Sequence, residues 1–276
     1  MISPAIRAVT LGLALFTTGY DTPGGRTSVR QHDGARAGLR SVAPEGVSVP
    51  FGAGEKSTFD VRFGGVRVGS SALEVIGVES VRGRDTWHTS FTVHGGAFFY
   101  RVNDVYESWI DTRTLNSLLF IRQIEEGTRE REHTFEIMPE RGLYVERTRK
   151  GSRTLRTVAE PLDEAAFLYF VRTVPLVVGR TYDFNRYFMP DRNPVRIRVL
   201  RKERVTVPAG TYNAIVLQPI IKTRGIFSEN GKAEVWLSDD PARMLLQIKS
   251  RLSFGSLNLY LRSYIPATAQ AQTLGR

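Results

Sequence analysis

The chain of 276 residues contains no cysteine. Disulfide bonds, thiolate metal sites and cysteine nucleophiles are therefore excluded as features of this protein. Tyr20 also occupies the place, after Thr17, Thr18 and Gly19, where a bacterial lipoprotein would carry its acylated cysteine. We therefore expect no diacylglycerol anchor.

Histidine is scarce as well. The four histidines are His32, His88, His94 and His133, and no H-x-H or H-E-x-x-H pattern occurs. His88 and His94 share one face of a predicted strand, but six residues of extended chain place them about 20 Å apart. The sequence therefore predicts neither a metal site nor a cofactor.

Motifs of two common enzyme classes are also missing. The sequence has neither the G-x-S-x-G turn of serine hydrolases nor the G-x-x-x-x-G-K-[ST] loop of nucleotide-binding proteins. The adjacent carboxylates Asp239 and Asp240 could support acid–base chemistry or bind a cation. Their position before Pro241 favours a turn instead, in which Arg243 pairs with one of them. We identify no catalytic residue and predict that the protein is not an enzyme.

Long hydrophobic runs are absent too. The run at 8–16 has nine residues, which is too short to span a bilayer. It follows Arg7 and precedes small residues, as in a secretory signal peptide, so we predict a signal peptide at 1–20. No later segment is apolar enough for a transmembrane helix. The expected location is the periplasm or the cell envelope.

The rest of the chain divides by composition. Residues 21–50 are rich in Gly, Pro, Ser and Arg without a sustained period, which is typical of a flexible linker. Residues 51–265 are expected to form a single antiparallel β domain. Residues 266–276 are small and polar, and we expect them to be a disordered tail.

Short alternating runs fill the domain. Phe59, Val61 and Phe63 share one face of a predicted strand, and similar runs recur up to Ile265. The exception is 162–174, where Asp163 can cap a short helix. Many strands without crossover helices imply antiparallel pairing, and curling removes long free edges. The predicted fold is all-β with one short helix: a large curved antiparallel sheet, half-barrel or barrel-like, around an apolar interior.

The net charge is +10, and +8 of it falls after residue 50. A basic domain attracts anionic partners. Arg147 and Arg149 share one strand face, and Arg196 and Arg198 share another. If these strands adjoin, they form a cationic wall that could bind an anionic ligand. The alternative is solvated strand faces paired with nearby glutamates. Export and the lack of a nucleic-acid-binding motif argue against nucleic acid.

Four segments also match a known pattern of residues in order. The residues concerned are Gly54, Glu55, Phe59, Asp60, Val61, Asp163, Arg172, Pro208, Gly210, Trp236, Asp239, Asp240 and Arg243. Together they resemble a bacterial exported family catalogued as domain of unknown function 3108. The chain departs from it at Ala165 and Ala166, where serine is common, and at Leu245, where proline is common. The resemblance implies an envelope protein with a curved antiparallel sheet, and implies no activity.

Physical chemistry suggests roles for two of these motifs. Pro208 and Gly210 are expected to form a turn between long strands, and Trp236 is expected to pack in the interior. The leading functional hypothesis is a non-enzymatic binding or carrier protein for a lipidic or anionic envelope molecule. One alternative is a structural envelope protein that contacts anionic polysaccharide or a protein partner. The least favoured alternative is a hydrolase that uses Asp239 and Asp240.

Overall fold

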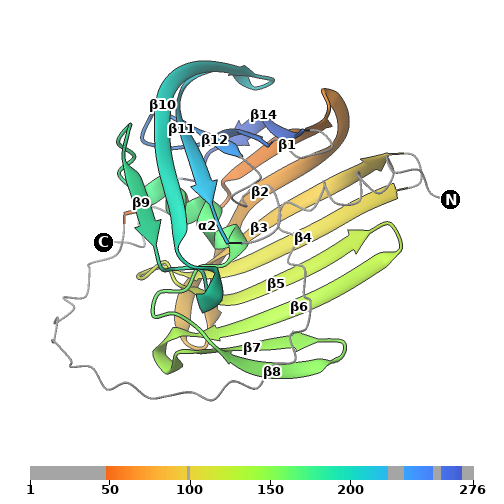
Figure 1. Cartoon of the computed structure of the whole chain (residues 1–276), viewed down its shortest axis with the longest axis vertical. Coiled ribbons are helices and arrows are strands. Elements are labelled where there is room, and N and C mark those ends of the chain that lie inside the picture. The colour runs from red at the N-terminus through yellow and green to blue at the C-terminus, as the bar shows by residue number, and fades with distance from the viewer. Residues whose placement is uncertain (1–47, 98–99, 223–232, 251–255, 269–276) are drawn as a thin grey trace.

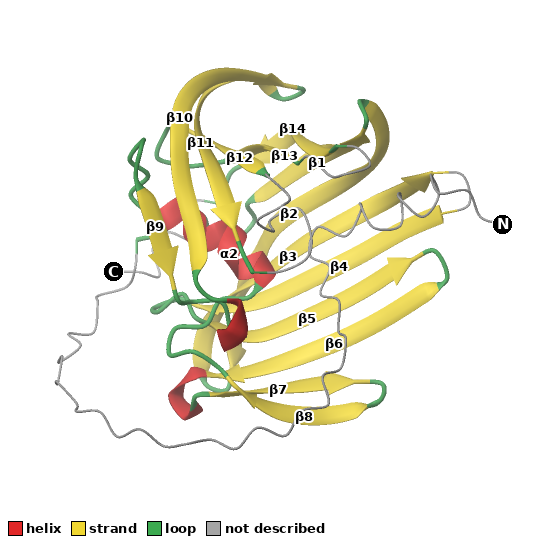
Figure 2. Cartoon of the chain, in the orientation of Figure 1, coloured by secondary structure: helices red, strands yellow, loops and turns green. Residues whose placement is uncertain are grey.

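The computed structural model describes residues 48–97, 100–222, 233–250 and 256–268. The predicted signal peptide, nearly all of the predicted linker and most of the predicted tail lie outside the described residues. In the described part, fourteen strands form one antiparallel sheet (Figures 1 and 2). The all-β prediction is therefore confirmed.

The strands fall into two groups along the chain. The first group is β1 (Lys56–Phe63), β2 (Val66–Val81), β3 (Arg84–Ala97), β4 (Tyr100–Asp111), β5 (Ser117–Glu126), β6 (Arg129–Met138), β7 (Leu143–Thr148) and β8 (Gly151–Arg156). The second group is β9 (Thr181–Phe184), β10 (Val195–Val207), β11 (Gly210–Ile220), β12 (Glu234–Ser238), β13 (Leu245–Lys249) and β14 (Leu257–Ile265). Three 3-10 turns, η1 (Pro139–Arg141), η2 (Val171–Thr173) and η3 (Pro190–Arg192), and one α-helix lie between strands.

Each group is a meander in which consecutive strands pair. The order across the sheet is β8 to β1, then β14 to β9, so that the first and last strands of the domain are neighbours. Their register runs from Lys56 opposite Ile265 to Phe63 opposite Leu257. The free edges of the sheet are β8 and β9, which follow one another in the sequence.

The chain between these two edges enters the interior and forms α2 (Glu164–Phe170). Asp163 caps this helix, because its Oδ1 accepts hydrogen bonds from the amides of Ala165 and Ala166 at 2.9 and 2.8 Å. All seven residues of α2 are buried. Figure 1 shows α2 between β9–β12 on one side and β2–β6 on the other. The predicted helix is confirmed, and it is a core element of the fold.

No helix among the described residues is long and apolar enough to cross a membrane.

Aromatic side chains from both groups form the core below α2. Phe135 lies 5.6 Å from Phe120 and 5.2 Å from Phe188, measured between ring centroids. Tyr144 lies 5.2 Å from Phe188 in an edge-to-face arrangement. Such pairs stabilise a core by about 0.5–1.5 kcal/mol each beyond their buried area. They attach the loop after β9 to the concave faces of β5, β6 and β7.

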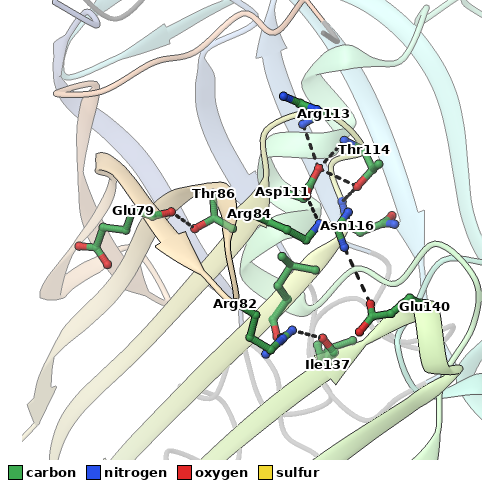
Figure 3. A network of polar contacts seen from close by, with 11 residues as sticks. Glu79, Arg82, Arg84, Thr86, Asp111, Arg113, Thr114, Asn116, Ile137 and Glu140 are labelled. Atoms are coloured by element: carbon green, nitrogen blue, oxygen red, sulfur yellow. Dashed lines mark hydrogen bonds and ion pairs between the residues drawn. The ribbon is translucent and has the colours of Figure 1, made fainter. Parts of the chain in front are cut away.

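A polar network fixes the turn between β4 and β5 (Figure 3). Asp111 accepts hydrogen bonds through Oδ1 from the amides of Arg113 and Thr114, at 3.0 and 2.8 Å. Its Oδ2 lies 2.8 Å from Nε of Arg84 on β3. Arg82, in the left-handed region with φ 51°, donates to one carbonyl of β5 and one of β6. One end of the sheet is therefore joined by side chains as well as by strand pairing.

A buried ion pair joins α2 to both ends of the domain. Arg172 donates to Glu55 through Nη1 and Nη2, at 2.5 and 3.0 Å. The same guanidinium donates to the carbonyls of Pro50 and Ala242, at 2.9 and 2.8 Å. The hydroxyl of Tyr264 on β14 donates to Glu55 at 3.2 Å. Four segments distant in sequence therefore meet at one pair of charges.

Substitution of Arg172 tests how much the fold depends on this pair. Arg172→Met leaves the Glu55 carboxylate buried without its cation, so we expect a loss of about 3–5 kcal/mol in the free energy of unfolding. The matched control is Arg147→Met, which removes an exposed pair with Glu136 and is expected to cost less than about 1 kcal/mol. Urea unfolding measures both, and equal losses would contradict the assignment.

Candidate functional site

The concave face of the sheet has a polar half and an apolar half, with α2 between them. The polar half follows the inward positions of five neighbouring strands. We name it the inner polar row, and it consists of Asp104, Tyr106, Arg122, Glu126, His133, Glu146 and Arg153. Arg122 lies directly opposite Tyr106 on one neighbouring strand and opposite His133 on the other.

One end of the inner polar row is an ion-paired ladder near the free edge at β8. Glu146 on β7 accepts hydrogen bonds from His133 at 2.8 Å and from Arg153 at 2.5 Å. Burial alone would raise the pKa of Glu146, but the bonds from His133 and Arg153 outweigh it and lower the pKa. Glu146 is therefore held as a carboxylate between two donors.

The other end of the row holds two buried carboxyls, Asp104 and Glu126. Asp104 is 0% exposed and Glu126 is 7% exposed. Burial, with the negative charge of Glu126 adding to it, raises the pKa of Asp104 to about 7. Burial also raises the pKa of Glu126. Oδ1 of Asp104 accepts a bond from the amide of Glu125 at 3.2 Å, but its Oδ2 has no partner among the described residues, and neither has Oε1 of Glu126.

The N-terminal end of α2 contacts this polar half. Oδ2 of Asp163 accepts a hydrogen bond from Ser108 at 2.6 Å, and the Asp163 amide donates to Ser117 at 2.9 Å. Burial raises the pKa of Asp163 to about 7. Next to it, Oε1 of Glu164 accepts a bond from Tyr187 at 2.5 Å and lies 3.8 Å from Nη1 of Arg122. The helix is thus attached to the sheet through its first residues.

The apolar half lies between α2 and the strands β9–β12. Two voids of about 10 Å³ each lie there, which is close to the space that one water molecule needs. Phe167 lines both. The first void is also lined by Leu162, Asp163, Glu164, Phe184, Arg186, Tyr187, Val195 and Ile221. The second is also lined by Leu168, Val171, Ile197, Leu217, Pro219 and Val235. Around α2, the predicted apolar interior is therefore filled by side chains.

The four arginines predicted as ligand-binding residues belong to two separate parts of the sheet and not to the inner polar row. Arg147 and Arg149 belong to β7 and its turn, whereas Arg196 and Arg198 belong to β10. The strands paired with β7 are β6 and β8, and those paired with β10 are β9 and β11, so the two groups do not adjoin in the sheet. Three of the arginines pair with acids at 3.6 Å or less, the partners being Glu136, Glu130 and Asp183. A shared cationic wall requires these strands to be neighbours, and in the described sheet they are not.

The adjacent carboxylates Asp239 and Asp240 have structural partners. Oδ1 of Asp240 accepts hydrogen bonds from the amides of Ala242 and Arg243, at 3.0 and 3.1 Å. Asp239 lies 2.8 Å from Nζ of Lys202 on β10. Asp240 therefore organises the turn that the sequence predicts there, and Arg243 contributes its amide to it.

The other motif residues also have structural positions. Pro208 lies in the turn between β10 and β11, and Gly210 begins β11 with φ 141°, as the predicted turn requires. Gly54 has φ 81° and donates its amide to Val75. Glu55 forms the buried pair with Arg172 described above.

Trp236 is buried, but on the convex face of the sheet. Its neighbour Val235 lines the void beside α2, so Trp236 points the opposite way. Its Nε1 donates to Glu203 at 2.6 Å, and Arg201 and Lys249 lie 5.8 and 5.2 Å from its ring. The prediction that Trp236 is buried is confirmed, since it is 3% exposed, but its side chain lies on the face of β12 opposite the void. Two long cationic side chains cover it instead of the core.

The residues that sequence reasoning missed are Asp104, Glu126 and Glu164, and the inward position of Arg122 was not predicted either. The available signal was a charge at an inward position, such as Arg122 between Phe120 and Ile124 on β5. The alternation of apolar and polar residues alone would assign such a charge to a solvated face. Among the described residues, no group of three or more His, Asp or Glu side chains is placed to hold a metal ion.

The fold places the chain among antiparallel β proteins with a barrel-like sheet. It is similar to the crystal structure of a beta-barrel-like protein of domain of unknown function DUF1849 from Brucella abortus, with a TM-score of 0.52 and 8% identity, covering 80% of this chain and 100% of that one. The chain belongs to the family of proteins of unknown function DUF3108, whose profile matches residues 58–262. The predicted family is confirmed.

Two further solved structures are similar at lower scores. One is a candidate lipoprotein from Parabacteroides distasonis, with a TM-score of 0.31 and 13% identity over 79% of this chain and 98% of that one. The other is a candidate exported protein with a YmcC-like fold from Bacteroides fragilis, with a TM-score of 0.30 and 12% identity over 80% of this chain and 99% of that one. No curated protein matches the chain.

The raised pKa of Asp104 predicts a pH-dependent stability. The folded state binds a proton more tightly than the unfolded state, so the free energy of unfolding falls as pH rises from about 4 to 7. Asp104→Asn removes the contribution of Asp104 to this pH dependence, which is up to about 4 kcal/mol for the full shift in its pKa. Urea unfolding at pH 4.5 and pH 7.5 checks this. The exposed control Glu132→Gln should keep the wild-type difference in the free energy of unfolding between the two pH values. The same difference in Asp104→Asn as in the wild type would refute the prediction.

Proposed function

We propose that the protein is a non-enzymatic binding protein of the cell envelope that takes an acyl chain or a similar apolar group between α2 and the strands β9–β12. The observation that supports this most directly is the lining of the second void. Three apolar residues of α2 and η2 face four apolar residues of β10, β11 and β12 across it. This is the lining expected of a site for a hydrocarbon group.

Binding would require α2 to move, because each void holds no more than about one water molecule. A helix of seven residues is unstable alone, so α2 depends on its packing and on its polar contacts at each end. Those contacts are Asp163 with Ser108 and Ser117 at the start, and Arg172 with Glu55 after the helix. A shift of this segment away from β10–β12 would open one continuous apolar slot.

The segment after α2 also presents apolar side chains to solvent. Val177 and Val178 are 54% and 46% exposed, although they follow directly on the buried Leu176. Exposed apolar residues favour contact with an apolar ligand or surface. The signal-peptide pattern at 1–20 would deliver the protein to the envelope, where acylated molecules are abundant.

A catalytic role has no support from the carboxylates that the sequence singles out. Asp240 binds the backbone of its own turn, and Asp239 pairs with Lys202. We therefore keep binding as the proposed function. The outer arginines form separate pairs, so their geometry favours no single anionic polysaccharide site.

Titration with a fluorescent fatty acid tests the proposal. We expect saturable binding to the purified protein, and a solvent-extractable lipid in native mass spectra of protein isolated from its own envelope. Val235→Phe fills the void beside α2, so we expect it to weaken probe binding about tenfold or more. The matched control is Val66→Phe, an equal substitution at a residue that is 67% exposed, which should bind as the wild type does.

Circular dichroism and urea unfolding establish that both variants are folded. Absence of lipid together with absence of saturable probe binding would refute the proposed function. Saturable binding that Val235→Phe leaves unchanged would place the ligand elsewhere and refute the slot.

A further inference from the structure

We propose that the concave face of β4 and β5 binds an organic ammonium group at Asp104 and Glu126. This site lies in the inner polar row, whereas the apolar slot lies toward β9–β12. The proposal does not depend on the proposed function, because it concerns a different set of side chains and a ligand that is recognised by its ammonium group.

The strand register brings the two carboxyls together. Asp104 lies opposite Ile124, and Glu126 lies opposite Val102, so the two acids are diagonal neighbours on adjacent strands. Arg122 is the diagonal neighbour of Asp104 on its other side. The acids are close enough for the charge of Glu126 to act on Asp104.

Several polar atoms around these acids lack a hydrogen-bond partner among the described residues. They are Oδ2 of Asp104, Oε1 of Glu126 and Oγ of Ser71, and all three residues are more than nine-tenths buried. Ser71 and Asp104 are both paired with Val93, one from each side of β3, so Ser71 occupies the same level of the concave face two strands, or about 10 Å, from Asp104. Buried polar atoms are nearly always satisfied in folded proteins, so a group of unsatisfied ones indicates a missing partner.

The chemistry of these atoms defines the partner. Ionised carboxylate oxygens only accept hydrogen bonds, so the partner must donate. A positive charge on the partner would stabilise the Asp104 carboxylate, because the cation that acts on this acid, Arg122, already lies against Glu164 and over the ring of Phe135. Arg129 and Arg131 on β6 act on Glu126 instead. A primary ammonium offers three donors and one charge.

The neighbouring aromatic rings suit an alkylammonium. Tyr106 is two residues from Asp104 on the same face of β4, and Phe91 lies directly opposite it on β3. Their ring centroids are 6.0 Å apart. Aromatic faces attract organic cations and accommodate the methylene groups attached to them.

Binding would expel a proton near neutral pH. The pKa of Asp104 is about 7, so an appreciable fraction of the acid is protonated there, and an ammonium favours the carboxylate form. The charges that act on this acid are those of Glu126, Arg122 and Glu125, all on β5. Tyr106 on β4 is a titratable neighbour of Asp104, and Glu164 on α2 acts on Tyr106. Arg129 and Arg131 on β6 act on Glu126. A displaced proton is a signature that nonspecific surface binding of an amine lacks.

Calorimetric titration of the full chain with n-butylammonium chloride at pH 7 tests the proposal. We expect saturable binding at one site, with a heat that depends on the ionisation enthalpy of the buffer because a proton is released. Asp104→Asn and Glu126→Gln should each weaken binding about tenfold or more. The exposed Glu132→Gln is the matched control and should bind as the wild type does. Tetramethylammonium, which has no N–H donor, should bind more weakly than n-butylammonium.

The outcomes separate this site from the apolar slot. Val235→Phe should leave n-butylammonium binding unchanged, whatever it does to a fatty-acid probe. Two acid variants are used so that failure of one to fold still leaves the other to decide, with folding checked by urea unfolding. Absence of saturable binding, or equal binding by wild type and both folded acid variants, would overturn the proposal.

Discussion

The buried pair between Glu55 and Arg172 is the constraint on which the arrangement of the domain depends. A charge pair inside a protein is stable only when its remaining donors and acceptors are also satisfied. Here carbonyls of the segments at Pro50 and Ala242 and the hydroxyl of Tyr264 complete the set. The rings of Phe51 and Tyr169 add contacts with the guanidinium. The chain before β1, the segment after α2, the turn before β13 and the strand β14 must all be in place together.

The interior of this sheet is divided by chemistry. Toward β9–β12, α2 presents apolar side chains to apolar strands, and the two voids described there each have about the size of one water molecule. Toward β4–β8, the same helix meets a row of charges in which some acids are paired and others are not. Burial raises the pKa of Asp104 and of Asp163 to about 7, and for Asp163 it outweighs the hydrogen bonds that the carboxylate accepts. The acids that titrate near neutral pH therefore lie in the polar half or in contact with it.

Local patterns in the sequence were sufficient for the strands, for the helix after Asp163 and for the turn at Pro208. Each depends on residues within a few positions of one another, such as the cap formed by Asp163 on the amides of Ala165 and Ala166. The site could not be predicted in the same way. Glu164 meets Arg122 only because α2 enters the sheet, and Arg147 does not meet Arg196 because β7 and β10 lie near opposite edges of the sheet. Trp236 illustrates the same limit, since alternation gives two faces but does not say which one is concave.

The pairing of β1 with β14 has a consequence for how the chain folds. Each meander consists of hairpins between consecutive strands, which close short loops, whereas β1 and β14 are about 200 residues apart in sequence. A chain that emerges from its N-terminus first can form β1 to β8 while β14 is still absent. During that interval, the β1 edge presents unpaired backbone groups that any extended segment could join. The last strand to emerge is thus the one that ends the exposure of the first.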